Sequence, residues 1–129
     1  ATLQCNQAAL EAETNENTYA PPDLLHFAPS AAKGWAVWGV DGTLDANYNN
    51  DALTDTGTGD YTVNWTTDFS SVNYTVSTGL ELSTDATRMH PFLRSKAAGT
   101  VRVIVNNTSS SLSEANVSTI HVAGYGDQA

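Results

Sequence analysis

The sequence predicts a mainly β protein: an antiparallel β-sandwich head of jelly-roll type, preceded by a short helical and extended N-terminal arm. Apolar and polar residues alternate along several short segments from about residue 33 onward. Clusters of Asn, Asp, Gly and Ser separate these segments, as turns separate strands. The chain also holds 17 Thr, 11 Ser and 11 Asn, so uncharged hydrogen-bonding residues supply most of its polar surface. That composition is typical of β-rich extracellular or viral modules.

Residues 1–29 are expected to form the arm, and residues 30–129 the head. Thr2 is placed to cap a short helix over about Leu3 to Glu13, where Ala and Glu have high helix propensity. Pro21-Pro22 then favours an extended passage. So short a helix is marginal in water. The arm must therefore pack against its own domain, another subunit or a neighbouring protein.

Six strands are expected in the head, each rich in β-branched or aromatic residues. Tyr61, Val63 and Trp65 share one face of the second strand, which predicts that this face lies in the core. The expected strands are, in chain order, Gly34–Val40, Gly59–Thr67, Ser71–Ser77, Thr78–Ser83, Thr100–Asn107 and Val117–Tyr125.

Turns and loops are expected between these strands. Polar clusters at Asn47–Asp51 and Asp55–Asp60 have the composition of turns. In the second cluster, Gly57 and Gly59 can adopt a positive φ and fix a tight connection into the following strand. Residues Asp85–Ala98 contain an apolar stretch that does not alternate, which predicts a long loop.

The charge balance excludes two classes of partner. Fourteen Asp and Glu residues stand against five Lys and Arg residues, giving a formal charge of -9. No basic surface is therefore available to bind a phosphate backbone or an anionic lipid surface. No apolar stretch has the length of a membrane-spanning helix, and the N-terminus lacks the pattern of a signal peptide. We expect no nucleic-acid partner and no membrane insertion.

No metal site and no cofactor are expected. Cys5 has no partner, and the histidines lie in separate segments without metal-ligand spacing: His26, His90 and His121. One oxygen-rich cluster has the ligand types that Ca²⁺ prefers, although turn formation explains it better: Asp41, Asp45 and Asp51 with Asn47, Asn49 and Asn50.

No catalytic residues are expected either. A glycosidase needs two carboxylates fixed in a groove. Glu81 and Glu114 are the only Glu residues outside the arm, and Glu81 alternates with leucines as a solvent-facing strand residue does. No nucleophile-elbow motif is present. The chain is therefore not expected to be an enzyme.

Three runs of the sequence resemble one family. KGWAVWGVDGTL, then ALTDTGTGDYTVNWTTDF, then NYTV follow the order of the terminal module of bacteriophage tail fibres and other virion fibre or spike proteins. That module has a K-x-W strand, a G-T segment, a T-D-x-G-T-G-D-Y-T-V-x-[FW] hairpin and an N-Y-x-V strand. The matching positions here are Lys33 and Trp35, Gly42-Thr43, Leu53 to Trp65, and Asn73 to Val76. Trp65 stands where the family usually has Phe.

The resemblance implies a homotrimer on the surface of a virion, on its tail or its capsid. Such a trimer would attach to the bacterial host, with surface polysaccharide as the partner, and residues 1–29 would dock on other virion proteins. An alternative is a structural virion protein without a receptor: a capsid decoration, or an adaptor of the tail or fibre.

Aromatic residues are the candidate binding residues, either at the trimer interface or against a glycan: Trp35, Trp38 and Tyr48. Trp35 and Trp38 have opposite parity on their strand, so at most one of them faces the interior. The other must be exposed, stacked on a sugar or buried against another subunit. Interface burial is favoured over glycan stacking, because aromatic residues are enriched at interfaces and the resemblance implies a trimer.

Overall fold

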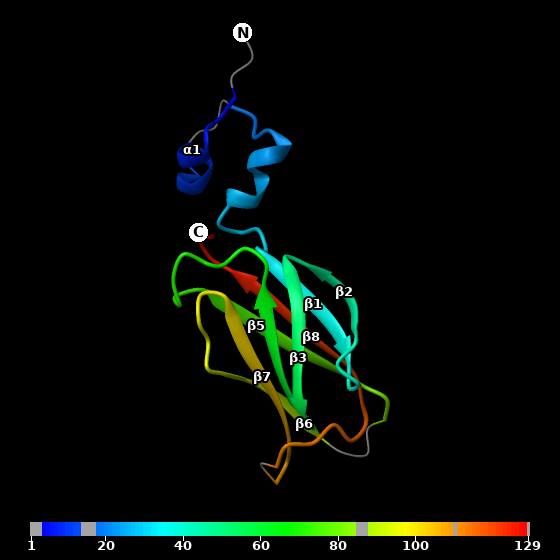
Figure 1. The fold of residues 1–129 in the computed structure, drawn as a ribbon. Helices are drawn as coiled ribbons and strands as arrows, with labels where there is room; N and C mark the ends of the chain where they lie inside the picture. The colour runs from blue at the N-terminus through cyan, green and yellow to red at the C-terminus, as the bar shows by residue number, and fades with distance from the viewer. Residues whose placement is uncertain (1–3, 14–17, 85–87, 110, 129) are drawn as a thin grey trace.

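The computed structural model describes residues 4–13, 18–84, 88–109 and 111–128. The head in this part of the chain is built from strands β1 (Gly34–Gly39), β2 (Leu44–Tyr48), β3 (Asn50–Gly57), β4 (Asp60–Trp65), β5 (Thr75–Leu82), β6 (Met89–Arg94), β7 (Thr100–Asn107) and β8 (Val117–Tyr125). They form two four-stranded antiparallel sheets (Figure 1). The first sheet has the order β2-β1-β8-β5, and the second has the order β3-β4-β7-β6. The predicted mainly β fold with an antiparallel sandwich is thus confirmed.

The core lies between the two sheets and follows the alternation of the strands. Tyr61, Val63 and Trp65 of β4 are buried, as their shared parity predicts. Burial of each large apolar side chain stabilises the fold by about 1.5–3 kcal/mol. The other buried residues of this cluster are Ala36, Trp38, Phe69, Tyr74, Met89, Val101, Val103, Val105, Val117, Ile120 and Val122.

The two strands expected over 71–83 are in fact one. β5 runs without a break from Thr75 to Leu82 because it pairs along its whole length with β8. The segment before it is a turn, in which the backbone N–H of Asn73 donates to Ser71 Oγ at 3.1 Å. Ser71–Asn73 is therefore not part of a strand.

Three further strands lie where turns or loops were expected. The polar segment that holds β2 and β3 passes from one sheet to the other at Asn49, which has φ 53°. The Asn49 side chain fixes this corner, because it donates to the carbonyl of Lys33 at 2.9 Å and accepts from the N–H of Thr67 at 2.7 Å. β6 replaces part of the expected loop, and Pro91 is tolerated because β6 is an edge strand.

The arm contains two short helices, α1 (Gln7–Ala12) and the 3-10 helix η1 (Pro22–Phe27). α1 begins later than predicted, because Asn6 is its N-cap: Asn6 Oδ1 accepts from the N–H of Ala9 at 2.9 Å. The proposed cap, Thr2, lies outside the described residues. η1 replaces the extended passage expected after the two prolines, since proline is tolerated in the first turn of a helix.

Lys33 joins the arm to the head. The two helices lie together beyond one end of the sandwich (Figure 1). Lys33 is buried, and its Nζ donates to the carbonyl of Ala28 at 2.6 Å, while its backbone N–H donates to the carbonyl of Gly124 at 2.8 Å. Burial lowers the pKa of the Lys33 ammonium, and the charges of Asp127 and Glu11 oppose this shift.

Candidate functional site: an uncharged sheet face

The outward side of the first sheet brings two of the predicted residues together. Trp35 of β1 pairs with Tyr48 of β2, so both side chains lie on the same side of the sheet. On its other side Trp35 pairs with Ala123 of β8, which in turn pairs with Ser77 of β5. A second row runs parallel to this one and consists of Ala46, Val37, His121 and Gly79.

Aromatic side chains are concentrated at the end of this face that is nearer the arm. Trp35 is 38% exposed and Tyr48 is 50% exposed. Tyr125, which pairs with Thr75 in a third row, is 37% exposed. Tyr125 is not among the candidate residues expected from the sequence, although its parity with His121 on β8 places both on one face. We call the outward residues of these three rows the uncharged face.

The uncharged face contains no Asp, Glu, Lys or Arg. A carboxylate follows in the next row of β5, where Glu81 pairs with Thr119. The outward side of the second sheet is different, because it carries the ion pair between Arg102 and Asp60 and also Arg94, which pairs with Arg102. The two outward sides of the sandwich therefore differ in chemistry, although the chain as a whole has a charge of -9.

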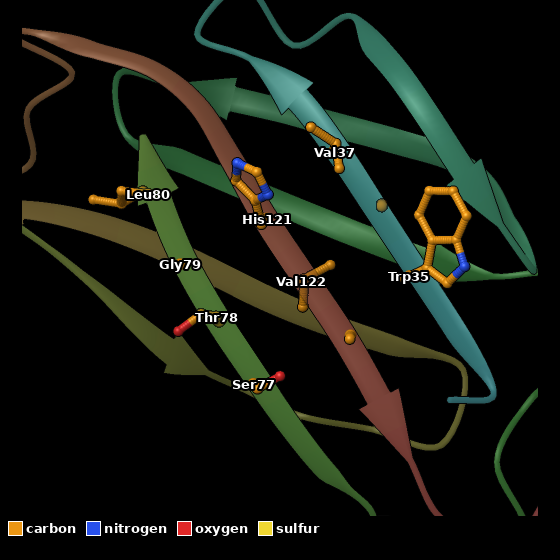
Figure 2. Close-up of a pocket in the computed structure, with 10 residues that line it drawn as sticks. Trp35, Val37, Ser77, Thr78, Gly79, Leu80, His121 and Val122 are labelled. Atoms are coloured by element: carbon orange, nitrogen blue, oxygen red, sulfur yellow. The ribbon is translucent and has the colours of Figure 1, made fainter. Parts of the chain in front are cut away.

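A hollow of about 440 Å³ lies on the uncharged face, between β1, β8 and β5. Figure 2 shows Trp35 on β1 and His121 on β8 with their rings turned away from each other, and Ser77 and Gly79 on β5. A Cβ on Gly79 would meet no atom within 4 Å, so the glycine leaves this part of the hollow open. The lining residues are Trp35, Ala36, Val37, Ser77, Thr78, Gly79, Leu80, His121, Val122 and Ala123.

Ser77 and His121 are among the residues that line the hollow, and both have polar side chains. His121 Nε2 lies 2.8 Å from Thr119 Oγ1, which holds the ring on the outward side of β8. The Ser77 hydroxyl has no hydrogen-bond partner among the residues that the structure describes. The hollow is thus lined by an aromatic residue, a hydroxyl group and an imidazole.

Trp38, the third predicted residue, does not belong to this face. It is 0% exposed and lies in the core, where its ring contacts Tyr61 edge-on with the centroids 5.6 Å apart. The expectation that Trp38 contacts a glycan or another subunit is therefore wrong. The prediction that at most one of the two tryptophans faces the interior is confirmed, since Trp35 is exposed and Trp38 is buried.

The oxygen-rich cluster considered for Ca²⁺ is divided between a turn at Asp41, the corner at Asn49 and two strands, where turns were expected: β2 holds Asp45 and Asn47, and β3 holds Asn50 and Asp51. Asp41 Oδ1 accepts from the N–H of Thr43 at 3.0 Å, and this hydrogen bond lowers the pKa of Asp41. Asn49 is occupied at the corner between the sheets. Across the described ranges, no group of three or more His, Cys, Asp or Glu residues is placed to hold a metal ion.

Glu114 stabilises the hairpin that carries the T-D-x-G-T-G-D-Y pattern. Its Oε1 accepts from the Tyr61 hydroxyl and from the N–H of Gly59, both at 2.5 Å. Gly57 and Gly59 have φ 142° and 66°, so the prediction that glycines with a positive φ make this turn is confirmed. Burial raises the pKa of Tyr61, and the Glu114 carboxylate raises it further.

A scan against protein-family models found no match, and searches of curated proteins and of solved structures found none either. None of the helices in the described ranges has the length and apolar character needed to cross a bilayer.

Proposed function

We propose that this chain is the attachment module of a virion fibre or spike, which acts as a homotrimer and binds carbohydrate on a bacterial surface. The observation that carries the proposal is the uncharged face, with Trp35 half-exposed beside a hollow that has no charged lining. The order of the K-x-W, T-D-x-G-T-G-D-Y-T-V and N-Y-x-V segments supports the same function. In this proposal the protein binds its partner and catalyses no reaction.

Attachment is tested on purified polysaccharides. Capsular and lipopolysaccharide preparations from a panel of Gram-negative and Gram-positive bacteria are immobilised, and retention of the full chain is measured. We expect saturable retention on a small subset of the panel. Retention on none of the preparations, or equal retention on all of them, would contradict attachment through a specific carbohydrate.

The trimer is tested by light scattering on the purified chain. We expect a mass near three times the 13.7 kDa of one chain. A threefold assembly would strengthen weak sugar contacts by avidity. A monomer at micromolar concentration would contradict the trimer in solution and would favour a part that assembles only on the particle.

The alternative, a structural virion protein that docks through its arm, is favoured by a separate observation. The arm has contacts of its own: the N–H of Cys5 donates to the carbonyl of Tyr19 at 3.1 Å, and α1 packs on η1. Leu25 of η1 is 52% exposed, which leaves an apolar side chain for a docking partner. Antibodies against the head that label intact particles, and fail to label particles made with the arm deleted, would support docking through the arm.

A further inference from the structure

We propose that the hollow on the uncharged face binds one neutral sugar ring, with its apolar side against Trp35 and its hydroxyl groups toward Ser77 and His121. This inference rests on the proposed carbohydrate attachment and assigns it to a site. The hollow lies in the middle of the first sheet, between β1, β8 and β5, and not at the loops of the sandwich.

The size of the hollow fits a small ligand. Small-molecule sites have volumes of about 300–1,000 Å³, and this hollow measures about 440 Å³. The open space above Gly79 lets a ring approach the backbone of β5, since no side chain stands there. A bulkier residue at position 79 would fill this space.

The charges select a neutral ligand. No Lys or Arg lines the hollow, so a uronic or sialic acid would place its carboxylate against an uncharged surface on a chain of charge -9. An unpaired charge in such a place is unfavourable. A neutral hexose, deoxyhexose or N-acetylhexosamine has no such penalty.

The polar groups suit hydroxyl groups of a sugar. The Ser77 hydroxyl donates one hydrogen bond and accepts others, and the imidazole of His121 offers its second ring nitrogen while the first contacts Thr119. The exposed side of the Trp35 ring provides an apolar platform of the size of a pyranose ring.

The extent of the uncharged face argues against a second copy of the chain as the occupant. With strands about 4.8 Å apart and rows about 7 Å apart, the face measures about 14 Å in each direction, or roughly 200 Å². A stable protein–protein interface needs about 800 Å² per partner. The uncharged face by itself is smaller than such an interface, and it is large enough for one or two sugar rings.

Tryptophan fluorescence tests the site directly, because Trp38 and Trp65 are buried and only Trp35 is open to a quencher. The full chain is titrated with the methyl glycosides of glucose, galactose, rhamnose, N-acetylglucosamine and glucuronic acid, and acrylamide quenching is measured. We expect at least one neutral glycoside to protect Trp35 from acrylamide quenching, with a protection that saturates as the glycoside concentration rises. The glucuronide should bind about tenfold more weakly or not at all, because no Lys or Arg lines the hollow to pair with its carboxylate.

Two variants locate the binding. Gly79→Val adds side-chain atoms inside the hollow at a position with room for them and ordinary φ, so it should fold and abolish protection. Phe92→Ala removes a 49% exposed aromatic ring from the second sheet and should leave protection unchanged. Protection by no neutral glycoside, or unchanged protection in Gly79→Val, would overturn the proposal. So would a Trp35 already shielded in a multimeric free chain, which would make a second copy the occupant.

The polysaccharide panel separates failure of the site from failure of the function. If Gly79→Val is retained as well as the unmodified chain, attachment stands and the sugar site lies elsewhere. If a neutral glycoside protects Trp35 but no polysaccharide retains the chain, the site stands and attachment to bacteria is contradicted.

Discussion

Trp35 and Trp38 lie three positions apart on β1 and have opposite environments. Trp38 is fully buried, and its indole N–H has no acceptor among the described residues. Trp38→Ala would leave a large cavity between the sheets, so we expect the free energy of unfolding to fall by about 3–5 kcal/mol. Urea unfolding measures this loss.

The matched control is Trp35→Ala, which we expect to change stability by less than about 0.5 kcal/mol because the site is at the surface. Trp38→Phe should cost less than Trp38→Ala, since it keeps an aromatic ring and removes the unpaired N–H. Equal losses in Trp35→Ala and Trp38→Ala would contradict the burial seen at these positions.

Because of Tyr61, the stability of the fold should depend on pH in the alkaline range. Burial and the nearby Glu114 carboxylate raise the pKa of Tyr61 in the folded chain, so folding favours the neutral phenol. Its contribution is fully present below the ordinary tyrosine pKa of about 10 and is lost as pH rises beyond it. We expect Tyr61→Phe to lower the free energy of unfolding by about 1 kcal/mol at pH 7, because the variant lacks the hydrogen bond to Glu114.

The same variant should also flatten the decline in stability above pH 10, measured by urea unfolding across the alkaline range. Part of the decline should remain, because burial also raises the pKa of Tyr74. The exposed Tyr48→Phe serves as the control and should match the unmodified chain. An alkaline decline of the same steepness in Tyr61→Phe would show that other groups cause it.

At the scale of elements, the β3–β4 hairpin depends on a glycine that no other residue can replace. Gly59 has φ 66°, and a Cβ there would lie 2.7 Å from the carbonyl oxygen of Val105. Gly59→Ala should therefore destabilise the fold by about 2 kcal/mol or more. Gly79→Ala, in open space with ordinary φ, should be neutral or stabilising by about 0.5 kcal/mol. Thermal unfolding of the pair checks this contrast, and similar losses in both would contradict it.

The ion pair between Asp60 of β4 and Arg102 of β7 should make the stability of the fold depend on pH in the acid range. The hydrogen bond from Arg102 lowers the pKa of Asp60, so this pair stabilises the fold above the ordinary Asp pKa and stops doing so as pH falls. We expect Arg102→Gln to lower stability at neutral pH and to weaken its dependence on pH below 4, relative to the unmodified chain. Circular dichroism during acid titration measures this difference.

The strands that the sequence predicted well are those with buried, alternating faces. β4, β7 and β8 follow the pattern of apolar residues because every second side chain enters the core. The alternation of residues does not predict β2 and β3, because these strands are mostly exposed and rich in Asp and Asn, so pairing with neighbouring strands decides their structure. Only the family resemblance placed a hairpin over Leu53 to Trp65, which includes part of β3.

The candidate site could be predicted only in part. Parity alone separates Trp35 from Trp38, and the composition suggests that an exposed aromatic residue has a partner. The hollow itself requires the register that places Gly79 beside His121 and Ala123 beside Trp35, from strands far apart in the chain. No local pattern contains that information, so the sequence alone does not point to Ser77.

At the scale of the whole molecule, the head should fold without the arm. All residues of the core cluster lie between positions 36 and 122. Deletion of residues 1–29 should therefore leave a cooperative unfolding transition with little change in midpoint, because it removes the contact of Lys33 with Ala28 and no core side chain. Circular dichroism with thermal unfolding tests this, and a truncated chain without a cooperative transition would mean that the arm completes the head.

β8 pairs with β1 on one side and with β5 on the other, although it is the last strand of the described chain. During synthesis, β1, β2 and β5 emerge from the ribosome before the strand that joins them, so the first sheet stays incomplete until residues near 125 have been made. Until then the inner edges of β1 and β5 offer unpaired backbone groups to any neighbouring nascent chain. When several chains are made on one messenger RNA, the open edges of β1 and β5 can pair with a neighbouring chain until β8 of their own chain arrives and closes the sheet.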